Sequence, residues 1–170
     1  MTPGPGVDDN GVPVIDLRQS PLVGDLVGAE LSGFALAGIE LARADLSGAV
    51  ISECDLRAAD LGGAVLHRAH IVDTELADAR LDGVDGRDLV LVGDDLHGAS
   101  LRAADLRDVV VIGCDLRGAD LRGADLRDAT FSHTDLRGAD LSDANLEGTR
   151  GDFFWDDATR WPADFRPAAG

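Results

Sequence analysis

Large apolar residues recur at every fifth position along most of this chain. From Leu26 to Leu146 only Gly86 interrupts the series, which is most regular in residues 113–146. A small residue precedes most of these central positions by two, and an Asp often stands between them. A period of five fits neither the 3.6 residues of a helical turn nor the alternation of an isolated strand. The pattern therefore predicts a repeat structure in which neighbouring units bury a shared core.

The units ADLSG, ADLGG, ADLRD and ANLEG carry a resemblance to a known family. They resemble pentapeptide repeats, and the likeness covers residues 24–148. It implies an all-β fold, a right-handed quadrilateral β-helix with four pentapeptides per coil and with Leu and Ala directed inward. Stacked coils about 4.8 Å apart would give a solenoid of about six coils, roughly 30 Å long.

The two ends of the chain depart from the repeat. Residues 1–23 are interpreted as a flexible N-terminus, disordered over about the first ten residues, followed by an irregular cap of Val14, Ile15, Leu17 and Leu22, because a solenoid needs its open end covered. Residues 149–170 are interpreted as a partly helical C-terminal cap, with a helix-like segment at 151–159. Its aromatic side chains would close the tube or, alternatively, form a dimer contact: Phe153, Phe154, Trp155, Trp161 and Phe165.

Charge narrows the range of partners. The 32 Asp and Glu residues outnumber 15 basic residues, all of them Arg, for a formal net charge of −17. Such a field repels nucleic acid and anionic membranes and favours cations or basic protein surfaces. The same acidity could also serve solubility alone.

Four pentapeptides per coil would place residues twenty apart in columns on the surface. Three faces then carry Asp beside Arg, and the candidate DNA-mimicking columns consist of Asp105, Asp115, Asp120, Asp125, Asp135 and Asp140. The second face instead carries a candidate interface of Val72, Val90, Val92, Val110 and Ile112. Monomers seldom expose such an apolar patch. We expect a second copy, giving a homodimer, or another partner to cover it; the alternative is the N-terminal segment.

One irregularity interrupts the repeat at residues 84–96. Gly86 replaces a central Leu, and Asp94 occupies a position that should be inward and small. A buried, unpaired Asp is costly. Either Asp94 bonds to turn amides, or the coil bulges outward there; a tolerated irregularity is favoured over a functional loop.

Sites for chemistry are sparse. Cys54 and Cys114 would lie three coils apart, beyond disulfide reach, and are interpreted as core thiols. The four histidines, His67, His70, His97 and His133, lack metal-ligand spacing, and the chain carries no nucleotide or nucleophile motif. A regular convex rod offers no cleft to desolvate its carboxylates, so we expect no enzyme activity, metal or cofactor. No signal segment or apolar run of membrane-spanning length is found, so a cytoplasmic location without membrane insertion is expected.

Two function classes remain. The resemblance implies a DNA mimic that engages type II topoisomerases (DNA gyrase or topoisomerase IV) and protects against their poisons. The 25 acids and 11 Arg of residues 24–148 leave a net charge of −14. Over about 30 Å this is one charge per about 2 Å, against about 1.7 Å in duplex DNA. The alternative is a structural or scaffold module that binds proteins through its valine-rich face.

Overall fold

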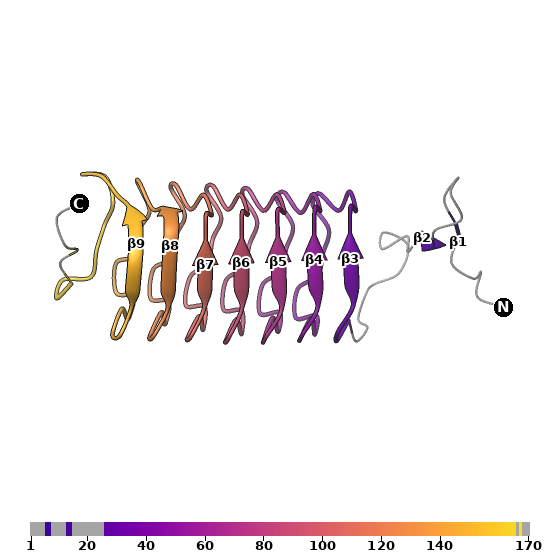
Figure 1. The fold of residues 1–170 in the computed structure, drawn as a ribbon, viewed down its shortest axis with the longest axis horizontal. Coiled ribbons are helices and arrows are strands. Elements are labelled where there is room, and N and C mark those ends of the chain that lie inside the picture. The colour runs from indigo at the N-terminus through magenta and orange to yellow at the C-terminus, as the bar shows by residue number, and fades with distance from the viewer. Residues whose placement is uncertain (1–5, 8–12, 15–25, 166, 168–170) are drawn as a thin grey trace.

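The chain forms a rod of stacked coils with one parallel sheet along its side (Figure 1). The computed structural model describes residues 6–7, 13–14, 26–165 and 167. Each strand of the rod begins twenty residues after the one before, and β3 to β8 pair in parallel without a register shift. The seven strands are β3 (Glu30–Ser32), β4 (Val50–Ser52), β5 (His70–Val72), β6 (Val90–Val92), β7 (Val110–Ile112), β8 (Thr130–Asp135) and β9 (Arg150–Phe154).

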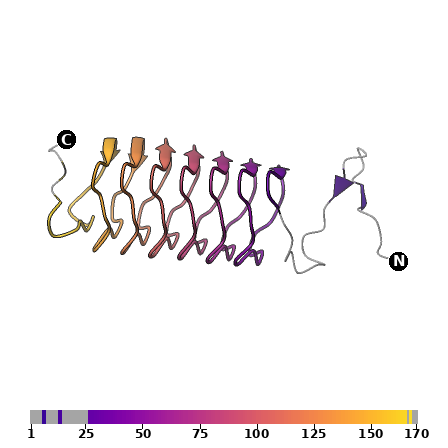
Figure 2. The ribbon, with the colours of Figure 1, turned by 90° about the horizontal axis from the view of Figure 1, so that it is seen from below.

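The other three sides of each coil are held by single parallel bridges between residues twenty apart. One bridge from each of these sides is Asp45 to Val65, Asp55 to Glu75 and Asp60 to Arg80. The sheet and the three columns of bridges make four sides, and the coils stack in Figure 2 with little change from one to the next. The predicted quadrilateral β-helix is confirmed.

The core consists of two inward rows, as the repeat predicts. Central residues such as Leu46, Leu66 and Leu96 are 0% exposed, and so are small partners such as Ala49 and Ala99. Burial of each large side chain contributes about 1.5–3 kcal/mol. Because each coil repeats the same layer, core burial is distributed along the rod rather than gathered at one centre.

The residue two positions after each central residue lies at a corner of the coil, and the backbone conformation there limits which residue types fit. This position has a positive φ along the rod, as at Gly28 (65°) and Asp88 (55°). At the first of these corners the N–H of Ala29 donates to the carbonyl of Leu26 at 3.0 Å, as in a type II turn. Gly adopts this conformation freely, and Asp tolerates it better than most residues do.

At the N-terminal end, only two short strands are described. Strand β1 (Gly6–Val7) pairs antiparallel with β2 (Pro13–Val14). Most of the predicted N-terminal cap, including Ile15, Leu17 and Leu22, lies outside the described residues, as does most of the segment predicted to be disordered. Both remain predictions.

At the C-terminal end, the prediction of a partly helical cap is wrong. The described residues contain no helix, and β9 continues the sheet through the segment expected to be helix-like. The N–H of Arg150 donates to the Ala129 carbonyl at 3.0 Å. The open edge of β8 thus supplies hydrogen-bond partners for the backbone of β9, whereas a short helix would have to form its hydrogen bonds internally. Phe131 pairs with Gly151, twenty residues later, whereas Thr134 pairs with Phe153, nineteen residues later. The register between β8 and β9 therefore shifts by one residue beyond Phe131.

The aromatic residues of the cap divide into two groups. Phe153 packs edge-on against Phe131, with ring centroids 5.9 Å apart, and Trp161 lies against Phe153 and Phe165. These three cap residues pack partly buried against the core and cover its last layer. Phe154 and Trp155 are instead exposed, at 56% and 36%, so they do not close the tube.

Candidate interaction surfaces

The predicted acidic columns form, but their carboxylates are bound to Arg. In the pair that begins at Asp105, Arg107 Nε donates to Oδ1 at 2.7 Å and Nη2 to Oδ2 at 2.6 Å. The same two-residue pairing recurs at Asp115, Asp120, Asp125 and Asp135. These Arg hydrogen bonds hold the pKa of all five carboxyls below its ordinary value. Asp140, the sixth predicted residue, accepts a hydrogen bond from Arg160 at 3.2 Å.

This pairing changes where uncompensated negative charge lies. A bidentate Arg largely neutralises the carboxylate that it binds, so the flat faces carry less net charge than their Asp content indicates. Six exposed Asp residues lie instead at the corners, in the left-handed conformation: Asp73, Asp78, Asp88, Asp108, Asp128 and Asp143. This group was not predicted from the sequence, although each of the six residues stands two positions after a central residue of the repeat.

Three of these corner residues form one column. Asp88, Asp108 and Asp128 follow one another at intervals of twenty residues, along the corner that precedes β6, β7 and β8. Asp88 lies 3.9 Å from Arg68 Nε. Within the described part of the chain, Asp108 and Asp128 form no ion pair. We call these three residues the acidic corner.

The valine-rich face consists of Val72, Val90, Val92, Val110 and Ile112, which lie on three neighbouring strands. Val72, Val92 and Ile112 are paired neighbours on β5, β6 and β7, and Val90 pairs with Val110 beside them. Ile112 is 42% exposed. The alternative cover, the N-terminal segment, lies almost wholly outside the described residues, so the occupant of the face stays a prediction.

Asp94 belongs to a buried column that sequence reasoning missed. The Thr74 N–H donates to Asp94 Oδ1 at 2.9 Å, and the Val92 N–H donates to Oδ2 at 3.0 Å. One coil earlier, the Cys54 N–H donates in the same way to Thr74 Oγ1 at 3.3 Å. The inward side chain of each of these coils thus satisfies an amide of the coil before it. The column comprises Cys54, Thr74, Asp94, Cys114 and Thr134, spaced by twenty, and that spacing was the signal available in the sequence.

These contacts settle the irregularity at residues 84–96. Asp94 is 1% exposed and bonds to backbone amides, which is the first of the two predicted alternatives. Strand β6 keeps its register with both neighbours, so the coil does not bulge. At Gly86 an added Cβ would lie 2.8 Å from Leu106 Cδ2, because neighbouring leucines fill the missing side chain's space. Burial raises the pKa of Asp94 to about 7.

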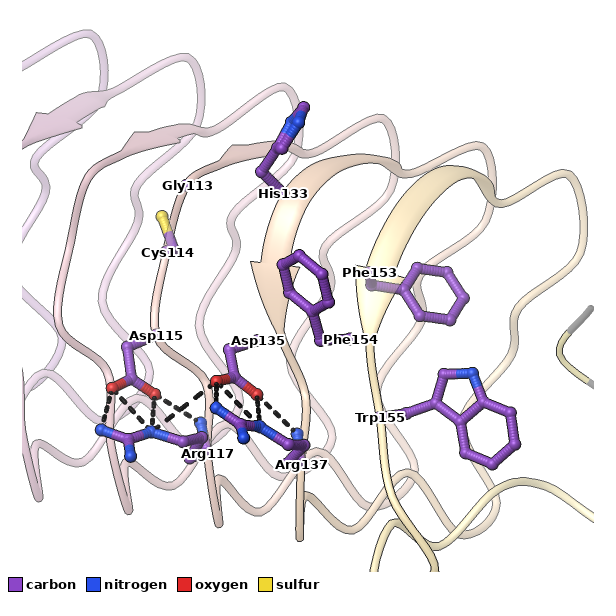
Figure 3. A pocket seen from close by; sticks show the side chains of 10 residues that line it. All are labelled: Gly113, Cys114, Asp115, Arg117, His133, Asp135, Arg137, Phe153, Phe154 and Trp155. Atoms are coloured by element: carbon purple, nitrogen blue, oxygen red, sulfur yellow. Dashed lines mark hydrogen bonds and ion pairs between the residues drawn. The ribbon is translucent and has the colours of Figure 1, made fainter. Parts of the chain in front are cut away.

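An open groove of about 890 Å³ lies beside the C-terminal coils (Figure 3). Phe154 and Trp155 line it at one end, and the stacked pairs Asp115–Arg117 and Asp135–Arg137 lie along its side. The guanidinium groups are committed to their own carboxylates, with Arg117 Nε also 3.9 Å from Asp135. The groove therefore offers few unused donors to a small ligand.

Groups for covalent or metal chemistry are not assembled in the described part of the chain. Cys54 and Cys114 are buried and free, in agreement with their interpretation as core thiols. Burial raises the pKa of the Cys114 thiol to about 12, which makes it a poor nucleophile. Among these residues no cluster of His, Cys, Asp or Glu is suited to hold a metal ion. The same residues include no helix with the length and apolarity to cross a bilayer.

Comparison with known proteins agrees with this architecture. The model for the family of pentapeptide repeats matches residues 25–63, 51–85 and 114–150, in 8 copies. The interval between these matches, 86–113, contains Asp94 and most of the valine-rich face. Curated protein sequences give no significant match.

Several solved structures resemble the chain. A pentapeptide-repeat protein from the Arabidopsis thaliana thylakoid lumen is 28% identical with a TM-score of 0.58, over 61% of this chain and 72% of that one. HetL, from Nostoc and involved in heterocyst differentiation regulation, is 25% identical with a TM-score of 0.30, over 79% and 81%. QnrB1, a plasmid-mediated fluoroquinolone resistance protein, is 16% identical with a TM-score of 0.44, over 72% and 89%. With matches to the family model over more than half its length, the chain belongs to the pentapeptide-repeat family.

Proposed function

We propose that this protein is a non-enzymatic binding protein that mimics duplex DNA toward a type II topoisomerase such as DNA gyrase, and protects that enzyme from its poisons. The observation that carries the proposal is the acidic corner. Asp88, Asp108 and Asp128 present exposed carboxylates in a row along a straight rod. A basic DNA-binding groove would meet there a regular line of negative charge, as it does on a phosphate backbone.

The charge density of the rod supports the same reading. Residues 24–148 carry a net charge of −14. Spread over about 30 Å, this is one charge per about 2 Å, close to the value of about 1.7 Å for the duplex. Because Arg neutralises much of the flat faces, the mimicry rests on the corners rather than on Asp105, Asp115, Asp120, Asp125, Asp135 and Asp140, which the sequence favoured.

A supercoiling assay with purified DNA gyrase tests this function. The chain should inhibit supercoiling or protect the enzyme from a quinolone at low salt, and the effect should weaken as salt rises because charge dominates the contact. No inhibition and no protection at any salt concentration would reject the proposal.

A second candidate function is a scaffold module of unassigned process. The observation that favours it is the apolar surface of the valine-rich face, where Ile112 is 42% exposed and the other four side chains are half-buried. Under this alternative, replacing Val90 and Val92 by Ser would abolish partner binding in cell extracts, while purified gyrase would be unaffected by the wild-type chain.

A further inference from the structure

The valine-rich face is bordered mainly by carboxylates along one of its two sides. At the corner before these strands, Asp88 and Asp108 precede β6 and β7, whereas Arg68 precedes β5. At the corner after them, exposed Asp73 follows β5, and glycines follow β6 and β7. The two apolar rows between these borders are two residues apart along each strand, or about 6.6 Å. The result is a narrow apolar strip that runs along the rod axis, with a line of negative charge on one side and a single carboxylate, Asp73, on the other.

We propose that this strip is the docking surface for a basic amphipathic α-helix of a protein partner. Such a helix has an apolar stripe bordered by Lys and Arg, which complements an apolar strip with Asp88 and Asp108 along one side and Asp73 on the other. The inference concerns the partner's chemistry and does not require that the partner be a topoisomerase.

The spacing of the strands favours a helix over an extended segment. Side chains of β5, β6 and β7 repeat along the axis at about 4.8 Å, close to the 5.4 Å pitch of a helix. An extended peptide repeats its side chains on one face at about 6.6 Å. Over the two steps between Val72, Val92 and Ile112, a helix laid along the rod stays nearly in phase with the strip, whereas an extended chain does not.

Charge argues against a second copy as the occupant. A face-to-face pair would bring together two chains that each have a formal net charge of −17, with Asp88 and Asp108 of each rod at the rim of the contact. Like charges at the rim oppose association. A helix with basic flanks removes this repulsion and gains attraction at the same positions.

A fluorescence anisotropy titration tests the proposal with the full-length chain. The probe is a labelled 15-residue peptide of Leu and Lys in which Leu follows the helical period. A peptide of the same composition with alternating Leu and Lys is the control for charge. We expect micromolar binding of the first peptide, about tenfold tighter than the second, which corresponds to about 1.4 kcal/mol.

Variants of the face then localise the binding. Val90→Ser with Val92→Ser should weaken binding of the helical peptide about tenfold. These substitutions should fold, because Ser32, Ser52 and Ser132 already occupy the same face. The matched control is Val65→Ser on another side of the rod, which should leave binding unchanged.

Several results would overturn the proposal. Equal affinity for both peptides would show that the interaction is non-specific attraction between charges. The same conclusion would follow if Val65→Ser weakened binding as much as the double Ser variant. Absence of binding would leave another occupant on the face. Sedimentation at about twice 17.7 kDa, lost in the double Ser variant, would assign the face to a second copy. A monomer that does not bind the peptide would reject a basic helix as the occupant. Because no topoisomerase is present, none of these results bears on the supercoiling assay.

Discussion

The backbone N–H of Thr74 donates to Asp94 Oδ1 at 2.9 Å, from one coil of the solenoid to the next. The other carboxylate oxygen accepts the Val92 N–H, so the side chain is fully used although it is 1% exposed. The contact explains how the repeat tolerates an Asp at an inward position. It also leaves a carboxyl whose pKa burial raises to about 7.

Stability should therefore depend on pH through Asp94. The folded pKa lies above the unfolded value of about 3.9, so the stability associated with the protonated group is full below about pH 4 and is lost as pH rises through about 7. Three pKa units correspond to roughly 4 kcal/mol. Asp94→Thr, which copies Thr74 and Thr134, should flatten this loss in urea unfolding at pH 5 and pH 8. Asp128→Asn, at an exposed corner, controls for net charge; an unchanged slope in Asp94→Thr would contradict the account.

Gly151 should be the least replaceable glycine of the rod. Its φ is 115°, and an added Cβ would overlap the Phe131 carbonyl oxygen. Gly151→Ala should cost at least about 3 kcal/mol or detach β9, because backbone cannot move aside as a flexible side chain can. Gly123→Ala is the matched control, since φ is 68° but nothing lies within 4 Å, and it should cost about 1–2 kcal/mol. Thermal unfolding compares the two, and equal losses would show that close packing at Gly151 is not limiting.

The Asp–Arg pairs on the flat faces should add little to stability. The side chain of Arg107 is 38% exposed although it binds Asp105 in a bidentate manner, and ion pairs in contact with solvent contribute about 0–1 kcal/mol. Arg107→Gln should lower the free energy of unfolding by less than about 1 kcal/mol, whereas Leu106→Ala next to it should cost about 2–5 kcal/mol. Urea denaturation measures both. A larger effect of Arg107 than of Leu106 would mean that the surface columns, rather than the core, stabilise the coils.

The repeat and the core could be predicted from the sequence because the five-residue period places each side chain directly. The valine-rich face followed from the same arithmetic, since residues twenty apart pair in register. The neutralisation of the acidic columns by Arg could not be predicted from the repeat, because bidentate pairing of Arg107 with Asp105 depends on side-chain geometry within the turn. The C-terminal helix was mispredicted because local composition does not reveal that β8 offers an unpaired edge to residues 150–154.

The acidic corner makes the proposed function open to a direct comparison of variants. Asp88→Asn, Asp108→Asn and Asp128→Asn together remove three charges from one row, and Asn tolerates the left-handed conformation of these positions. Asp73→Asn, Asp78→Asn and Asp143→Asn together remove the same charge from three other corners. The two triple variants thus have equal net charge and the same backbone demands.

The most direct measurement is the affinity of each variant for the DNA-binding core of gyrase, determined at several salt concentrations in competition with duplex DNA. The account predicts that the wild-type chain displaces DNA, that the acidic-corner variant binds about tenfold more weakly with a shallower salt dependence, and that the scattered variant loses about threefold or less. Failure of the wild-type chain to displace DNA at low salt, or equal losses in the two triple variants, would contradict it.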